Sequence, residues 1–537
     1  MQEIQLSLLI FTPLLAASIG LLIPAVNSGL FRYLSLVANL IQIAVIASVL
    51  SLFKSGDGIQ FVEYQSWITI DLGTWGTLRA AYFLGVDGLS LPLVALSVAI
   101  LLIATISSWN VKRQTKGYFL LLLLLNAAII GSFTALDFLL FYLFFEFMLL
   151  PMFFLIALWG GPRREYASIK FFLYTLVGSI FILVAMIALY ISVQEPMGSQ
   201  QIVHSFNLVN MRDWSNYLPG SVLEPGNARL IGIFDARQWC FLLLFLGFGI
   251  KLPMVPVHTW LPDAHVEAST PVSVLLAALL LKIGGYGLLR IAFPLFPDAA
   301  AYFGSFVGWV GVVSIIYGGL NAMSSKDLKR MIAYSSVSHM GFVLIGMASL
   351  TPEGVSGSVY QMFSHGILSA MLFLLAGVVY DRTHDRTIDH YSGLYKKMPV
   401  YSTFVLIAFF ASMGLPGFAG FIGEILVFLG AFKSNSAGGP LHESLAIIST
   451  VGLVVSAVYF LWTLQRMFFG PFFVKGEIQA DDLTDLRSHE YLVLLPLATA
   501  ALFFGIIPQP LVNVIEPFAK DFTTFILNAG TSIHSTH

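Results

Sequence analysis

Cysteine and charge are both scarce in this sequence. Cys240 is the single cysteine among 537 residues, which excludes an internal disulfide framework and an iron–sulfur cluster bound by several cysteines. Charged residues make up 10% of the chain, whereas an ordinary soluble domain carries about 25%. No basic run indicates a nucleic-acid partner, and no glycine-rich dinucleotide fingerprint is present. The chain itself is therefore expected to bind neither a redox cofactor nor nucleic acid.

Apolar residues are abundant and occur in long runs. They make up 57% of the chain, and the mean hydropathy is +0.85. Runs such as 4–25, 118–133, 138–158 and 367–380 are too long and too apolar for the surface of a soluble protein. A helix needs about 20 apolar residues to cross the bilayer core. The sequence therefore predicts an all-α polytopic membrane protein, and residues 4–25 are expected to stay as its first span because no cleavage pattern follows them.

The apolar runs predict about fourteen transmembrane helices. Their expected positions are 4–25, 31–53, 82–108, 117–133, 136–158, 166–193, 238–258, 271–293, 301–322, 329–349, 355–380, 401–432, 444–468 and 489–507. The tail at 511–528 is expected to form an amphipathic surface helix. Two long connections, 54–81 and 194–237, are expected to form ordered caps on one face.

The distribution of lysine and arginine predicts the orientation of the chain. Loops on one side of the predicted spans carry roughly twice as many of these residues as the loops and the tail on the other side. The richer side should face the cytoplasm, so both termini are expected on the non-cytoplasmic side. A bacterial plasma membrane is the expected location.

Two predicted spans are interrupted by proline and glycine. The seventh runs into KLPMVPVHTWLPDAH at 251–265, and the twelfth contains ASMGLPGFAGFIGE at 411–424. Broken helices at corresponding positions are typical of inverted repeats and indicate a transport site. Since the two breaks lie five spans apart, the second copy would be inverted across the membrane.

Six ionisable residues lie within predicted spans, where a charge is costly and usually faces a polar interior. They are two acids, two lysines and two histidines: Glu146, Lys251, Lys282, His339, His365 and Glu424. Burial favours a neutral lysine, a neighbouring carboxylate favours a charged one, and histidine exchanges protons near neutral pH. Backbone carbonyls freed by proline beside Lys251 can hold water where they line a cavity. The set is therefore typical of a proton relay.

Simpler interpretations of these residues stay open. Glu146 and Lys251 could tie two helices together, and the two histidines could be hydrogen-bonded packing residues. Asp137, at the start of its span, is expected to cap a helix. No metal site is predicted, because no zinc pattern matches the spacing of His258, Asp263, His265 and Glu267.

Four stretches carry a resemblance to a known family. They are FFEFMLLPMFFLIALWGG at 144–161, KLPMVPVHTWLPDAHVEASTPVSVLLAALLLKIGGYGLLR at 251–290, SSKDLKRMIAYSSVSHMGF at 324–342 and MGLPGFAGFIGE at 413–424. The chain resembles the antiporter-like membrane subunits of respiratory complex I, and among them the M type (chain 4) of proton-translocating NADH:quinone oxidoreductase. Glu424 favours the M type, because the resembling L and N types carry lysine there. No long lateral helix, as in the L type, is expected after the last span, which also favours the M type.

The resemblance implies a fold with fourteen helices and two inverted five-helix repeats. Residues 1–116 would hold helices 1–3, residues 117–293 the first repeat (helices 4–8), residues 301–470 the second repeat (helices 9–13), and residues 489–537 the last helix and the tail. The proton pathway would run through Glu146, Lys251, Lys282 and Glu424, with His339 and His365 on the central axis.

The resemblance also implies the partners. The chain would move protons without catalytic redox residues of its own, and FMN, iron–sulfur clusters, NADH and quinone would bind to partner subunits. Those partners would include sibling subunits of types L and N, in contact with membrane lipids. Alternatives are a subunit of an Mrp-type Na⁺/H⁺ antiporter, of a membrane-bound hydrogenase, or of a ferredoxin- or plastoquinone-linked complex. A structural scaffold whose charges only tie helices together is a further alternative.

Overall fold

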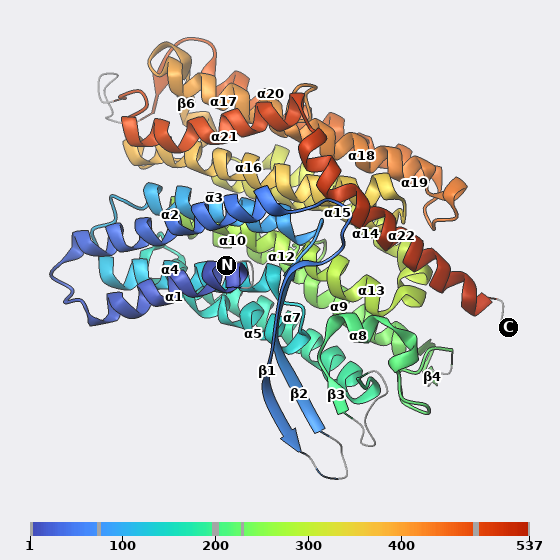
Figure 1. Cartoon of the computed structure of the whole chain (residues 1–537). Coiled ribbons are helices and arrows are strands. Elements are labelled where there is room, and N and C mark those ends of the chain that lie inside the picture. Colours follow the sequence, from blue (N-terminus) through green and yellow to red (C-terminus); the bar gives the residue numbers. More distant parts are fainter. Residues whose placement is uncertain are drawn as a thin grey trace.

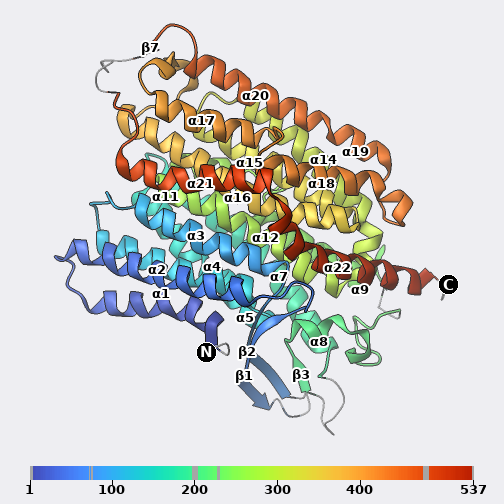
Figure 2. The ribbon, with the colours of Figure 1, turned by 45° about the horizontal axis from the view of Figure 1, so that its top comes forward.

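The computed structural model describes residues 4–71, 73, 77–195, 203–226, 230–475 and 483–534. Parts of the predicted connections 54–81 and 194–237, and the ends of the first and last predicted segments (1–3 and 535–537), lie outside the described residues. The chain is predominantly helical, and its long helices lie side by side in one bundle (Figures 1 and 2). This confirms the predicted all-α fold class.

The first half of the bundle follows the predicted spans within a few residues, with one exception at 82–108. Its helices are α1 (Gln5–Leu22), α2 (Ser28–Leu52), α3 (Ser90–Ser107), α4 (Thr115–Thr134), α5 (Phe138–Phe147), α6 (Leu149–Trp159) and α7 (Arg164–Ser192). A short helix, α8 (Leu208–Arg212), lies in the long connection that follows. Asp137 caps α5 by accepting a hydrogen bond from the backbone N–H of Leu140 at 3.0 Å, which confirms its predicted role.

The second half contains a run of helical segments with two π-helical turns. The run consists of α11 (Thr270–Leu275), η4 (Leu276–Leu280, π), α12 (Leu281–Gly287), η5 (Leu288–Ala292, π) and α13 (Phe293–Leu295). Before it lie α9 (Ala236–Lys251) and α10 (Trp260–Glu267). After it lie α14 (Pro297–Ser324), α15 (Leu328–Ala348), α16 (Pro352–Thr383), α17 (Pro399–Ser412), α18 (Ala419–Lys433), α19 (Glu443–Ser449), α20 (Val451–Phe468), α21 (Ser488–Ile506) and α22 (Gln509–His534).

Within the described residues, twelve helical segments are long and apolar enough to cross a membrane. The other two predicted spans contain shorter helices: at 238–258 only α9 forms, and α10 begins beyond that span at Trp260, whereas 401–432 is divided into α17 and α18. α9 ends at Lys251, two residues before Pro253, and α17 ends just before Gly414, whose φ is +75°. The breaks therefore occur where proline and glycine predict them.

The span predicted at 82–108 is wrong at its start. Thr77–Val86 forms strand β2, which pairs antiparallel with β1 (Gln60–Asp71) and parallel with β3 (Val203–Ser205), so the helix begins only at Ser90. A short apolar run suits a strand and a buried helix equally well, which is why periodicity misplaced this boundary. The β1–β2 hairpin extends away from the helices (Figure 1). Two further pairs are short: β4 (Leu230–Ile231) with β5 (Phe234–Asp235), and β6 (Tyr391–Ser392) with β7 (Phe473–Val474).

The centre of the bundle is α16. Nearly all of its residues from Gly354 to Val379 are buried, and it packs against α3, α11, α15, α18, α21 and α22. Small residues allow close helix packing nearby: a Cβ on Gly341 of α15 would lie 2.6 Å from the carbonyl oxygen of Gly311 on α14. A polar side chain on α16 therefore faces other helices and is shielded from lipid.

The predicted surface helix at 511–528 is confirmed and is longer than expected. α22 crosses the ends of the other helices (red in Figure 1) and packs against α14 and α16. Its buried residues recur every three or four positions, as an amphipathic helix requires: Leu511, Ile515, Ala519, Phe522 and Ile526.

Candidate functional site

The six predicted relay residues come from six different helical elements. Five are at most 5% exposed, whereas Glu146 is half-buried: Lys251 on α9, Lys282 on α12, His339 on α15, His365 on α16, Glu424 on α18 and Glu146 on α5. Isolated buried charges are rare because water solvates them far better than apolar protein does. Five buried ionisable groups in one bundle therefore need polar partners within the protein.

Lys282 and His365 are in direct contact. The Lys282 Nζ atom lies 2.7 Å from His365 Nδ1 and 2.6 Å from the carbonyl oxygen of Ala277. That carbonyl is five residues before Lys282, within the π-helical turn η4, where the ordinary α-helical hydrogen-bond pattern is interrupted. The π-turn thus offers an acceptor to the ammonium group on one side, while α16 presents the imidazole on the other.

The contacts continue from His365 to Glu424. The rings of His365 and His339 lie 5.5 Å apart between centroids, and His339 Nδ1 lies 3.6 Å from Glu424 Oε1. The Gln361 amide, one helical turn before His365, reaches His339 Nδ1 at 3.4 Å. Four buried ionisable side chains, Lys282, His365, His339 and Glu424, therefore lie next to one another in a series across α12, α16, α15 and α18.

Lys251 lies at the first helix break and points toward α5. Its Nζ donates a 3.4 Å hydrogen bond to the carbonyl oxygen of Phe145 and lies 3.5 Å from the centre of the Phe145 ring. Phe145 immediately precedes Glu146, but Lys251 and Glu146 form no ion pair in the described part of the chain. The Glu146 Oε1 atom is buried without a hydrogen-bond partner among the described residues. Lys251 therefore contacts the residue next to Glu146 but does not form an ion pair with the Glu146 carboxylate.

The second helix break makes room for Glu424. Gly414 takes a left-handed φ of +75°, and a Cβ at this position would overlap the Glu424 carboxylate. Glycine therefore serves two purposes here, since it permits the turn and leaves space for the carboxyl group. The predicted link between the broken twelfth span and Glu424 has a direct physical basis.

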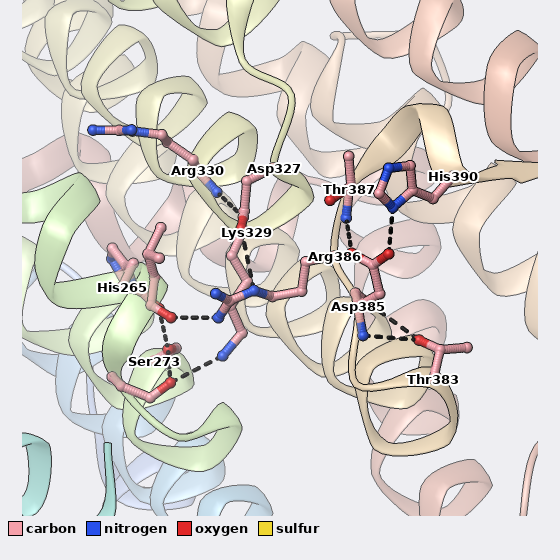
Figure 3. A network of polar contacts seen from close by, with 12 residues as sticks. His265, Ser273, Asp327, Lys329, Arg330, Thr383, Asp385, Arg386, Thr387 and His390 are labelled. Carbon is pink, nitrogen blue, oxygen red and sulfur yellow. Dashed lines mark hydrogen bonds and ion pairs between the residues drawn. The ribbon is translucent and has the colours of Figure 1, made fainter. Parts of the chain in front are cut away.

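A second polar network lies where α10, α15 and the end of α16 meet (Figure 3). Lys329 donates a 2.9 Å hydrogen bond from Nζ to the carbonyl oxygen of Ala268. Arg386 forms a 3.1 Å ion pair with Asp327 and donates to the carbonyl oxygen of Val266. Lys329 was not among the predicted relay residues, yet it is only 2% exposed. Its position two residues after the helix-capping Asp327 is the signal that would have placed it inside the helix.

The loop beside this network carries a titratable pair outside the spans. Burial alone would raise the pKa of Asp385, but hydrogen bonds from His390 and from the backbone N–H of Thr387 hold that pKa below its usual range. Asp385 is therefore a carboxylate at neutral pH and fixes the loop between α16 and α17.

Two histidines that invited a metal interpretation pack against aromatic rings instead. His265 stacks on Phe373 with 4.3 Å between ring centroids, and His258 meets Tyr317 edge to face at 5.2 Å. Neither imidazole has a hydrogen-bond partner among the described residues. Those residues also contain no group of three or more His, Cys, Asp or Glu side chains arranged to hold a metal ion. His265 lies within electrostatic range of both Lys282 and Lys329, so it borders the two polar networks.

Chains of two solved membrane complexes have the same fold as this chain. A chain of respiratory complex I from Thermus thermophilus superposes with a TM-score of 0.79 and 28% identity, covering 98% of this chain and 100% of that one. A chain of the Mrp complex from Dietzia sp. DQ12-45-1b has the same fold, with a TM-score of 0.78, 19% identity and coverage of 98% and 99%. The family model for NADH:quinone oxidoreductase/Mrp antiporter transmembrane proteins matches residues 135–449.

Comparisons with curated sequences narrow the family. NADH-quinone oxidoreductase subunit M of Rhodobacter capsulatus is 39% identical over 518 residues, which cover 95% of each chain. Subunit M of Rickettsia prowazekii is 38% identical over 516 residues, covering 95% of this chain and 97% of that one. NAD(P)H-quinone oxidoreductase chain 4 1 of Synechococcus elongatus is 39% identical over 515 residues, with coverage of 95% and 89%. This chain belongs to the family of NADH-quinone oxidoreductase M subunits.

Proposed function

We propose that this chain is the proton-translocating M-type subunit of an NADH:quinone oxidoreductase. It couples quinone reduction in partner subunits to proton transfer through its own buried Glu, Lys and His side chains. The observation that carries the proposal is the series of neighbouring buried side chains from Lys282 to Glu424, in a chain that matches curated M subunits over nearly their whole length.

The Lys282–His365 contact suits proton transfer, because the pair can hold only one proton easily. Two positive charges 2.7 Å apart would repel by roughly 6 kcal/mol even at an effective dielectric constant of about 20. The two groups therefore hold a single positive charge between them, and their hydrogen-bonding contact is the path by which a proton on Lys282 can pass to the imidazole. His339 and Glu424 are the next acceptors, and Glu424 is the terminal donor or acceptor toward the outer face.

Glu146 and Lys251 are proposed to control the relay from its other end. The carboxylate of Glu146 favours a charged Lys251, and weakening its influence would release the Lys251 proton toward Lys282. The half-buried position of Glu146 beside the exposed side chains of Leu143 and Phe147 supports this proposal. A neighbouring subunit would cover that face and could alter the field at Glu146.

The chain is proposed to consist of two inverted repeats, 117–293 and 301–470, flanked by 1–116 and 489–537. The division of α9 from α10 and of α17 from α18, one break in each segment, supports this arrangement. Each break then brings one relay residue, Lys251 or Glu424, to the interior.

Electron transfer is proposed to take place entirely in partner subunits, which would hold FMN and the iron–sulfur clusters and bind NADH and quinone. The partners include sibling subunits of types L and N. The complex would lie in a bacterial plasma membrane, with both termini of this chain on the non-cytoplasmic side, as the lysine and arginine distribution favours.

The test is to tag the native chain, extract it gently, and assay the purified complex. Co-purification of flavin, iron–sulfur absorbance and NADH:quinone activity, together with proton pumping in proteoliposomes, is the expected result. A colourless complex of membrane subunits that exchanges Na⁺ for protons would replace this proposal with an Mrp-type antiporter. Activity with ferredoxin or hydrogen, and none with NADH, would assign the chain to one of the related complexes.

A further inference from the structure

The series of buried groups has one gap, between His365 and His339. Their rings are 5.5 Å apart and tilted by 52°, and no hydrogen bond joins them in the described part of the chain. By contrast, Lys282 and His365 are 2.7 Å apart, within hydrogen-bonding distance. A proton that reaches His365 therefore needs an intermediate carrier to continue.

A small cavity lies beside this gap. It has a volume of about 10 Å³ and is lined by both histidines and by Ser412 of α17. This is close to the smallest volume that holds one water molecule, which also needs two to four polar partners. Two buried polar atoms on its lining have no partner among the described residues: His339 Nε2 and Ser412 Oγ.

The unpartnered hydroxyl of Ser412 is unusual for a helical serine. Serine in a helix commonly donates back to a carbonyl three or four residues earlier, as Ser402 on the same helix does to Met398 at 2.7 Å. Ser412 is the last residue of α17 and is 3% exposed, yet its Oγ makes no such bond. A buried polar atom without a partner is costly, so its persistence calls for a bound group.

We propose that this cavity binds a single water molecule, held by Ser412 Oγ, His339 Nε2 and the ring of His365, and that Ser412 is the positioning residue for it. The proposal rests on the proposed proton-transfer function for its consequence, although the water site itself does not depend on that function. The helix break between α17 and α18 would then have two roles. It leaves space for the Glu424 carboxylate, and it places the Ser412 hydroxyl, at the end of α17, where it can bind the water.

The transfer through this water conserves protons and involves no electrons. Lys282 gives a proton from Nζ to His365 Nδ1, and His365 releases the proton of Nε2 to the water oxygen. The water passes one of its own protons to His339 Nε2 and is left intact. His339 then carries the charge, 3.6 Å from Glu424 Oε1.

The experiment compares three variants in the assembled complex. S412A removes the hydroxyl, S412C keeps a weak hydrogen-bonding group of similar size, and S402A removes a neighbouring hydroxyl whose bond stays within α17. Proton pumping and NADH oxidation are measured per bound flavin. In parallel, infrared difference spectra recorded in H₂¹⁶O and H₂¹⁸O identify the O–H stretching band of an isolated buried water.

S412A is expected to lose the water band and to pump about fivefold more slowly, the factor that corresponds to one lost ordinary hydrogen bond of about 1 kcal/mol. S412C should fall between S412A and the wild type, and S402A should match the wild type. An unchanged water band and pumping rate in S412A would overturn the proposal, as would equal losses in S412A and S402A. If S412A does not assemble, the water band of S412C tests the proposal: a weakened or shifted band supports it, and a band identical to that of the wild type overturns it. Failure of the tagged chain to co-purify with flavin would instead refute the proposed function, and the infrared measurement would still test the water site.

Discussion

The space that Gly414 leaves for the Glu424 carboxylate leads to a sharp prediction. In G414A, the new Cβ would overlap the carboxylate oxygen Oε2 and lie 3.1 Å from Cδ. Carbon atoms in good contact are about 3.5–4.0 Å apart, so the carboxyl carbon has to withdraw by roughly 0.5 Å or more. Because His339 Nδ1 and Glu424 Oε1 are 3.6 Å apart, a shift of this size changes the geometry of the last step of the relay.

A second glycine in the same turn provides a matched control. Gly417 has a φ of +96°, and a Cβ there would meet no atom within 4 Å. An alanine at either position costs about 1–3 kcal/mol of backbone strain, so the two variants should lose similar thermal stability. Only G414A also displaces the carboxylate.

The assay reconstitutes the purified complex in proteoliposomes and measures the initial rate of proton pumping per bound flavin. G414A is expected to pump at least tenfold more slowly than G417A, since proton transfer requires hydrogen-bond geometry that the displaced carboxylate no longer offers. Equal pumping by the two variants, with both complexes fully assembled, would refute the assignment of Glu424 to the relay.

Three further predictions concern charges elsewhere in the chain. E146Q should slow pumping because Lys251 loses the carboxylate that favours its charged form; wild-type pumping at full assembly would show that this link is wrong. D87A should lower the stability of the complex by about 3–5 kcal/mol, because it strands Arg290, which pairs with Asp87 at 2.6 Å in a largely buried contact; a thermal midpoint within error of wild type would contradict this. K329M removes a buried cation that has no ion pair among the described residues and should raise the thermal midpoint; a lower midpoint would show that the hydrogen bond to Ala268 outweighs the cost of burying the charge.

The membrane class and the helix breaks could be predicted because they depend on local features. Runs of apolar residues decide which segments cross a bilayer, and Pro253 and Gly414 interrupt a helix through their own backbone restrictions. The dependence on local features also explains why the start of the span predicted at 82–108 was wrong. The run at 82–86 suits a strand or a buried helix, and its pairing with β1 selected the strand.

The relay residues could be picked out one by one, because a charge in an apolar span stands out in any sequence. Their mutual contacts could not be predicted. Lys282 and His365 are 83 positions apart, and their 2.7 Å contact depends on the π-helical turn before Lys282 and on how α12 packs against α16. Lys329 shows the converse case, since a charge near a span end looks solvated until packing buries it.

The sequence by itself determined which residues are costly to bury and where the helices must break, because both follow from the chemistry of single residues and their near neighbours. Only the tertiary structure decided that four of those costly residues form one series, that Glu146 stays half-buried at the edge, and that Ser412 lines the same cavity as the two histidines. These arrangements depend on contacts between helices that are distant in the chain, and packing sets such contacts through shape and distance that no local pattern records.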